Sequence, residues 1–156
     1  MHPNVAKVAE AAAARGLPVE IRQFPEGTHT AADAAAAIGV EVAQIVKSLV
    51  FVVDGAPVMA LVAGHNRLDE GRLATALGGG VVQRADADLV KSATGYSIGG
   101  VPPFGHATEL RTVVDEDLLE LSEVWASAGT AYDVFPLSPA DLVRVSGGAV
   151  APLKQE

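Results

Sequence analysis

The stretch that decides the fold class is VKSLVFVVDGAPVMALVA, residues 46–63. Asp54-Gly55 stands between two apolar runs, and Asp-Gly in that setting is a strong signal for a β-hairpin, because the turn needs positive φ at both central positions. Both arms are apolar at consecutive positions rather than at alternate ones. This pattern is typical of strands buried on both faces, so the sequence predicts a hairpin in the middle of a covered sheet.

Helix and strand signals alternate on both sides of this hairpin. Thr30 begins a Thr-Ala-Ala-Asp motif, and Ser138-Pro139 is a cap followed by proline at the first helical position. Helices are expected at 3–16, 30–38, 68–77, 86–93 and 138–145, and further strands at 19–24, 81–82, 111–114, 124–127 and 132–135. Strands that arrive both in a hairpin and between helices imply a mixed sheet. We therefore expect an α/β or α+β fold with one curled central sheet, in a single domain over 1–156.

The composition excludes several classes of protein. The chain has 156 residues, 49% of them apolar, and no cysteine, which fits a folded domain without disulfides or a thiolate metal site. No run of residues is apolar enough for a membrane span, so a cytoplasmic protein without membrane contact is expected. The net charge of −8 argues against broad binding of nucleic acid. The late acidic run 115–123 is expected on solvated helix faces, and Arg67, Arg72, Arg84 and Lys91 are the candidates for local RNA contacts.

Two short motifs match known catalytic patterns but lie in the wrong context. Residues 95–99 read G-x-S-x-G, yet a nucleophile elbow needs a helix after the serine, and the Gly-Gly-Val-Pro-Pro run that follows cannot form one. His106 is the only histidine after Ser97, and no acid lies between them. Residues 100–105 have the outer glycine spacing of a phosphate loop without its lysine. A serine esterase and a nucleotide site are therefore weak alternatives, and the four separated histidines predict no metal site.

One lysine and one loop carry the stronger signal. Lys47 stands at the entrance of an apolar strand, where an ammonium group needs anionic or carbonyl company, although its charged end could also simply reach solvent. Residues 95–105 hold four glycines and two adjacent prolines, and such a loop can turn backbone N–H groups toward a ligand. A side chain at Gly100 is expected to intrude on backbone that approaches the substrate.

The motifs together resemble a known family. Residues 30–33 with 38–40, Val46-Lys47-Ser48 and the long pattern over 92–105 are similar, in order and over nearly the whole chain, to the YbaK/EbsC family of aminoacyl-tRNA deacylases. These are relatives of the editing domain of bacterial prolyl-tRNA synthetase. The resemblance implies a mixed, barrel-like sheet surrounded by helices. It also implies hydrolysis of the ester in mischarged tRNA, with Lys47 and the loop from Gly99 to Pro103 at the site.

The residues are consistent with that chemistry. An aminoacyl ester is already activated, so donors for the developing oxyanion and a positioned water suffice. The expected catalytic residues are Lys47, Gly99, Gly100, Val101 and Pro103. The expected substrate-binding residues are His29, Thr30, Ser48, Thr94, Gly95, Tyr96, Gly129 and Thr130.

No cofactor and no general base are expected, so the substrate itself would activate the water. The expected partners are the acceptor end of tRNA and an aminoacyl-tRNA synthetase. The expected substrate is tRNA-Pro carrying a small amino acid such as Ala, Ser, Thr or Cys. A non-catalytic module that binds aminoacyl-tRNA or a nucleotide is the alternative.

Overall fold

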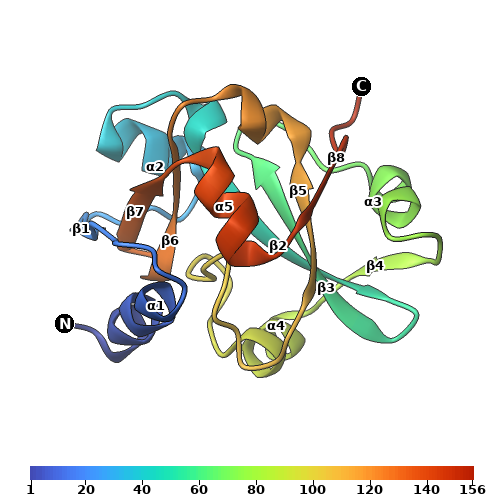
Figure 1. The fold of residues 1–156 in the computed structure, drawn as a ribbon, viewed down its shortest axis with the longest axis horizontal. Coiled ribbons are helices and arrows are strands. Elements are labelled where there is room, and N and C mark those ends of the chain that lie inside the picture. The colour runs from blue at the N-terminus through green and yellow to red at the C-terminus, as the bar shows by residue number, and fades with distance from the viewer.

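The computed structural model describes residues 1–156 and contains two β-sheets (Figure 1). The larger sheet has the order β4-β2-β3-β5-β8, and the smaller one has the order β1-β7-β6. The strands are β1 Arg22–Gln23, β2 Val46–Val53, β3 Ala56–Ala63, β4 Val82–Arg84, β5 Arg111–Asp115, β6 Val124–Thr130, β7 Asp133–Leu137 and β8 Ala149–Ala151. Strand β3 runs antiparallel to β2 and parallel to β5, so the predicted mixed sheet and the α+β class are confirmed.

The hairpin of β2 and β3 forms as the sequence predicts. Val46 pairs with Ala63 and Val53 with Ala56, and the turn residues Asp54 and Gly55 have φ of 52° and 82°. Alternate residues of β3 enter different apolar clusters. Met59 and Leu61 pack in the main core, whereas Ala60 and Val62 belong to a second cluster under helix α3 (Glu70–Ala76). The hairpin is therefore covered on both faces, which explains its continuous apolar sequence.

Most of the helices begin at the capping residues that the sequence predicts. The hydroxyl of Thr30 accepts from the Asp33 N–H, and Asp69, Asp86 and Ser138 cap their helices in the same way. The helices are α1 Pro3–Ala14, α2 Ala31–Ile38, α3 Glu70–Ala76, α4 Ala87–Thr94 and α5 Pro139–Ser146, with the 3-10 turns η1 Val42–Gln44 and η2 Glu116–Glu120. None of them has both the length and the apolar character needed to cross a membrane.

The expectation of a barrel-like sheet is wrong, because the two sheets do not close on each other. The larger sheet ends in β4 and β8, and a single bridge between Ile45 and Trp125 links it to the smaller sheet. The main core lies between the sheets and is completed by residues of α1, α4 and α5. Strand β8 and the two 3-10 turns were not predicted, since each is too short to show a periodic pattern.

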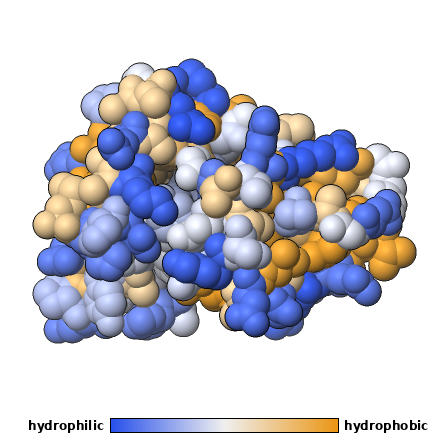
Figure 2. Space-filling model, turned by 90° about the horizontal axis from the view of Figure 1, so that it is seen from below, coloured by the Kyte–Doolittle hydropathy of each residue, from blue (hydrophilic) through white to orange (hydrophobic).

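Part of the apolar cluster under α3 reaches the surface. Figure 2 shows apolar residues gathered at the end of the molecule where the β2–β3 hairpin and β4 lie. Val82 packs on this cluster while partly exposed, and Val81 next to it is 70% exposed. The apolar corner thus lies at β4, beside the hairpin, whereas the predicted site residues of β2 lie at the other end of that strand.

Candidate functional site

Six of the predicted site residues line one pocket of about 330 Å³. It lies where the start of β2, the segment before α2, the loop 95–105 and the smaller sheet meet. The six residues are His29, Thr30, Lys47, Ser48, Gly99 and Val101. The remaining wall is largely apolar and includes Ala34, Ala126 and Trp125. The buried hydroxyl of Ser48 has no hydrogen-bond partner in the protein, so a polar group is available in this wall.

Lys47 joins this pocket to a larger groove. Its half-buried Nζ donates to the backbone carbonyl of Asn66 at 2.5 Å. Burial lowers the pKa of Lys47, the charge of Asp115 opposes that effect, and Arg67 adds to it. The groove has a volume of about 850 Å³ and is lined on one side by Lys47, His65, Arg67 and Arg84. Asp69 and Glu70 line it as well, so the cationic groups of this acidic chain gather there without excluding carboxylates.

The four basic residues expected to contact RNA separate into two pairs. Arg67 and Arg84 line the groove beside Lys47. Arg72 forms an ion pair with Glu156 at 2.9 Å, and Lys91 on α4 donates to the Gly95 carbonyl at 3.3 Å. The structure therefore places only Arg67 and Arg84 next to the pocket.

The loop 95–105 brings backbone donors to the pocket. Gly99 has a φ of 91°, and the N–H of Gly100 closes a turn onto the Ser97 carbonyl. The N–H groups of Gly99 and Val101 donate to no group of the protein, although Val101 is only 4% exposed. A buried N–H without a partner is uncommon in native proteins. Gly99 and Val101 both line the pocket, and free N–H donors are the groups that stabilise an oxyanion.

Gly100 itself faces away from the open pocket. A Cβ at Gly100 would lie 2.9 Å from the Thr130 Cα and 3.1 Å from the Gly129 carbonyl oxygen. The expected intrusion on backbone therefore falls on Gly129 and Thr130 of the smaller sheet, which do not line the pocket. Only glycine allows the loop to pack this closely on Gly129 and Thr130.

Several predicted site residues lie outside the pocket lining. The Thr94 hydroxyl donates toward the Val90 and Tyr96 carbonyls and accepts from the Tyr96 N–H, and Gly95 ends α4 in a left-handed conformation. Tyr96 is only 1% exposed. Within the described fold these three residues shape the start of the loop.

Three further candidates also sit behind or beside the pocket. Pro103 lines a separate groove together with His106, whose Nε2 bonds the Pro102 carbonyl. Gly129 receives the Asn4 side chain on its carbonyl, and the Thr130 hydroxyl donates to Asp133. Their predicted roles remain predictions.

The nucleophile-elbow alternative finds no support in the geometry. Ser97 is exposed in a turn, with neither a strand before it nor a helix after it. His106, the one histidine that follows, bonds the Pro102 carbonyl. No group of three or more His, Cys, Asp or Glu side chains is arranged to hold a metal ion.

The sequence did not indicate a role for two residues near Lys47, Asn66 and Asp115. Asn66 gives its carbonyl to the lysine, and Asp115 is fully buried although the acidic run 115–123 is expected on solvated faces. That expectation is wrong for Asp115, because the backbone and side-chain N–H groups around it replace water. A strand-ending Asp followed by charged residues carries no local signal for such burial.

Comparison with known proteins decides the family. The model of the aminoacyl-tRNA editing domain matches residues 25–145. The chain belongs to the aminoacyl-tRNA editing domain family. This membership confirms the resemblance inferred from the motifs. The matched range contains the whole pocket and the groove beside Lys47 except Gln155.

Relatives of this editing domain occur both alone and inside larger enzymes. The proline–tRNA ligase of Maridesulfovibrio salexigens is 37% identical over 65% of this chain, which corresponds to 17% of the ligase. An Enterococcus faecalis protein named "Putative Cys-tRNA(Pro)/Cys-tRNA(Cys) deacylase EbsC" is 30% identical over 79% of this chain and 76% of its own length. A crystal structure described as "a putative trans-editing enzyme for prolyl tRNA synthetase" has 43% identity and a TM-score of 0.94, covering 100% of this chain and 99% of that one.

Proposed function

We propose that this editing domain hydrolyses the ester of mischarged tRNA-Pro in trans, releasing a small amino acid. The observation that carries the proposal is the pocket that Lys47 lines together with Gly99 and Val101, whose backbone N–H groups donate to no group of the protein. The named relatives, a proline–tRNA ligase and a Cys-tRNA(Pro) deacylase, support the choice of tRNA-Pro. This function would take place in the cytoplasm, beside the prolyl-tRNA synthetase.

The proposed reaction uses this chain's groups to bind and orient the ester. The ester carbonyl oxygen accepts from the N–H groups of Gly99 and Val101, which stabilise the negative charge that develops on it. Water adds to the carbonyl carbon, and the bond to the ribose oxygen of the terminal adenosine then breaks. The ribose hydroxyl and the free amino acid are the products. Lys47 contributes a positive charge at the mouth of the pocket, directed at the carbonyl or at the phosphate of the terminal nucleotide.

The water is activated by the substrate in this proposal. No Asp or Glu lines the pocket, and His29 is the only imidazole in its wall. The α-amino group and the vicinal ribose hydroxyl of aminoacyl-tRNA both lie next to the ester, so either can accept a proton as water attacks. Catalysis then rests on positioning and oxyanion stabilisation, which together can supply most of a rate enhancement.

Pocket size should set the amino-acid specificity. The wall contains Ala31, Ala34 and Ala126, and the pocket holds about 330 Å³ that must also admit part of the terminal ribose. We expect single-turnover deacylation of Ala-, Ser- or Cys-tRNA-Pro to exceed that of Phe-tRNA by about 10²-fold, because a small pocket excludes larger side chains sterically. The measurement is a panel of mischarged tRNAs with purified protein.

The same panel tests the function itself. Equal rates for Ala- and Phe-tRNA would contradict the size limit, whereas no turnover of any ester together with measurable tRNA binding would favour a binding module. Preference between a methyl, a hydroxyl and a thiol side chain should depend on Thr30 and Ser48, which line the pocket. Thr130 lies away from it, with its hydroxyl on Asp133.

Binding of tRNA should be local and only moderately sensitive to salt. Lys47, Arg67 and Arg84 are the cations beside the pocket, so about three phosphate contacts are available, which corresponds to a slope of log affinity against log salt of about −2 to −3. We expect Arg84→Ala to reduce the magnitude of this slope by about 1 for an acceptor-stem minihelix. Arg144→Ala is the control, because Arg144 lies on α5 and pairs with Asp141. A much steeper slope, or dependence on the anticodon arm, would contradict acceptor-end binding.

A further inference from the structure

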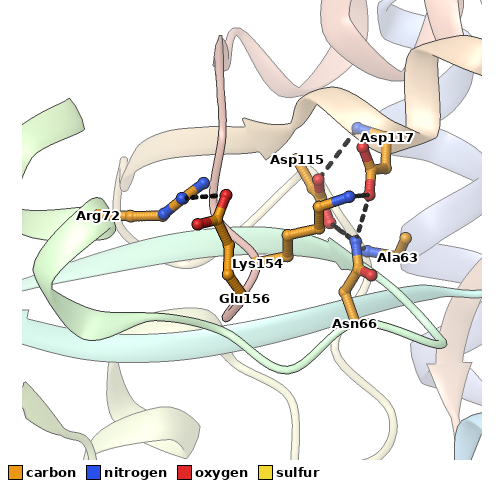
Figure 3. Close-up of polar contacts among 7 residues, drawn as sticks. All are labelled: Ala63, Asn66, Arg72, Asp115, Asp117, Lys154 and Glu156. Atoms are coloured by element: carbon orange, nitrogen blue, oxygen red, sulfur yellow. Dashed lines mark hydrogen bonds and ion pairs between the residues drawn. The ribbon is translucent and has the colours of Figure 1, made fainter.

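Asp115 is a buried carboxylate held entirely by N–H donors. It ends β5 and is 0% exposed. Its Oδ2 accepts from the Ala63 N–H at 3.1 Å and from the Asn66 side-chain amide at 2.9 Å, and its Oδ1 accepts from the Asp117 N–H at 3.0 Å (Figure 3). No lysine, arginine or histidine lies within ion-pair distance of it. Burying an unpaired charge is costly, so these three donors must be fixed in place.

Two of these donors belong to a single turn. The turn follows β3 and closes when the Asn66 N–H donates to the Ala63 carbonyl at 2.9 Å. Asp115 therefore accepts one hydrogen bond from the backbone of Ala63, the first residue of the turn, and one from the side chain of Asn66, the last residue. The Asn66 amide also donates to Asp117 at 2.8 Å, and Lys154 pairs with the same oxygen at 3.3 Å (Figure 3). With both contacts made, the Asn66 side chain has no freedom to rotate.

The clamped turn borders the groove beside Lys47, and its Asn66 backbone carbonyl accepts from the Lys47 Nζ. We infer that Asp115 is a positioning residue, which fixes the turn 63–66 so that the Asn66 carbonyl holds the Lys47 ammonium at the mouth of the pocket. This inference rests on the proposed function, since it assigns Asp115 a role through Lys47. Asp115 itself does not line the pocket.

The charge of Asp115 also favours the protonated form of Lys47. Burial lowers the pKa of Lys47, the Asp115 carboxylate raises it, and the Arg67 guanidinium lowers it. The other ionisable groups around the adjoining groove are His65, Asp69, Glu70 and Arg84. Removing the Asp115 charge should therefore move the alkaline limb of kcat/KM, which reports loss of the Lys47 proton, to lower pH.

The deciding experiment is a double-mutant cycle of Asp115→Asn and Lys47→Met. Asp115→Asn should lower kcat/KM for the best substrate by about 10- to 100-fold, as is typical when a group that orients a functional side chain is lost. In the Lys47→Met background it should cause almost no further loss, because the group it positions is gone. Additive losses, or an unshifted alkaline limb in Asp115→Asn, would overturn the inference.

Loss of stability is separated from loss of positioning by a matched variant. Leu142→Ala removes a fully buried side chain of the main core that lies on α5 and lines neither the pocket nor the groove. At temperatures where it remains folded, it should keep kcat/KM and the wild-type pH profile. If Asp115→Asn does not fold, Asn66→Ala replaces it in the cycle: it retains the Asp115 charge and the backbone carbonyl but removes both side-chain contacts of the turn. It should again be non-additive with Lys47→Met.

A readout without substrate distinguishes this inference from the proposed function. The Nζ resonance of Lys47 in ¹⁵N-labelled protein reports its titration directly. A lower pKa of Lys47 in Asp115→Asn than in wild type supports the inference, and an unchanged value overturns it. If the wild-type protein deacylates no tRNA, the proposed function fails while this titration still decides whether Asp115 governs Lys47.

Discussion

Replacement of Lys47 by methionine is expected to lower kcat/KM for deacylation by about 10²–10³-fold, the loss typical of removing one preorganised electrostatic contact in a reaction centre. The same change should not lower the melting temperature. Burial lowers the pKa of Lys47, which means that the folded protein disfavours its charged form, and methionine retains most of the aliphatic packing. Activity and stability should therefore separate, as measured by single-turnover hydrolysis and thermal unfolding.

The control for this result is Lys154→Met. Lys154 is also a lysine near the Asn66 turn, but its Nζ pairs with Asp117 outside the pocket. Its loss should leave kcat/KM within about 2-fold of wild type, since the Lys154 side chain is 46% exposed and a solvent-accessible ion pair contributes about 0–1 kcal/mol. Equal losses of melting temperature and activity in Lys47→Met would identify Lys47 as a structural residue and remove it from the proposed mechanism.

The second large effect is expected from Gly100→Ala. All three atoms that its Cβ would approach belong to the backbone of Gly129 and Thr130, at 2.9–3.1 Å, so no side chain can rotate away. Such overpacking costs about 1–3 kcal/mol of unfolding free energy. The loop must also shift away from the smaller sheet, which displaces the N–H groups of Gly99 and Val101, and a displacement near 1 Å can cost about 10²-fold in rate.

Gly55→Ala is the matched control for the loop variant. Gly55 lies in the hairpin turn with a φ of 82°, and its Cβ would have no neighbour within 4 Å. Forcing an alanine into that conformation costs about 1–2 kcal/mol without touching the pocket. Both variants should therefore have a lower melting temperature than wild type in thermal unfolding. Only Gly100→Ala should lose deacylation activity. A normal rate in Gly100→Ala would show that the loop 95–105 does not form the oxyanion site.

The local parts of the fold follow from neighbouring residues and were predictable for that reason. Asp54-Gly55 sets the hairpin, and Thr30 and Ser138 begin their helices through bonds to an N–H three residues ahead. A hydrogen bond that spans so few residues depends little on the rest of the chain. Strand 19–24 shows the limit: only Arg22–Gln23 pair, with Val134 and Asp133 of β7.

The candidate site was predicted in part. Lys47 and the loop were found from an unusual charge and an unusual number of glycines, and both line the pocket. The sequence did not indicate that Gly100 would pack on Gly129 and Thr130, or that Pro103 would line another groove. Those outcomes depend on how the loop turns over the smaller sheet, which is set by contacts with residues distant in the chain.

The sequence by itself determined the hairpin, the helix caps, the mixed α+β class and, through its motifs, the family. Only the tertiary structure decided that the sheets stay open, that Asp115 is buried and that Asn66 faces Lys47. The physical reason is the range of the interactions involved. Asn66 and Asp115 are 49 positions apart, and their contact forms only when the parallel pairing of β3 with β5 brings the two strand ends together. A carboxylate is stable there because three N–H donors replace water, and no local pattern of residues records that they will meet.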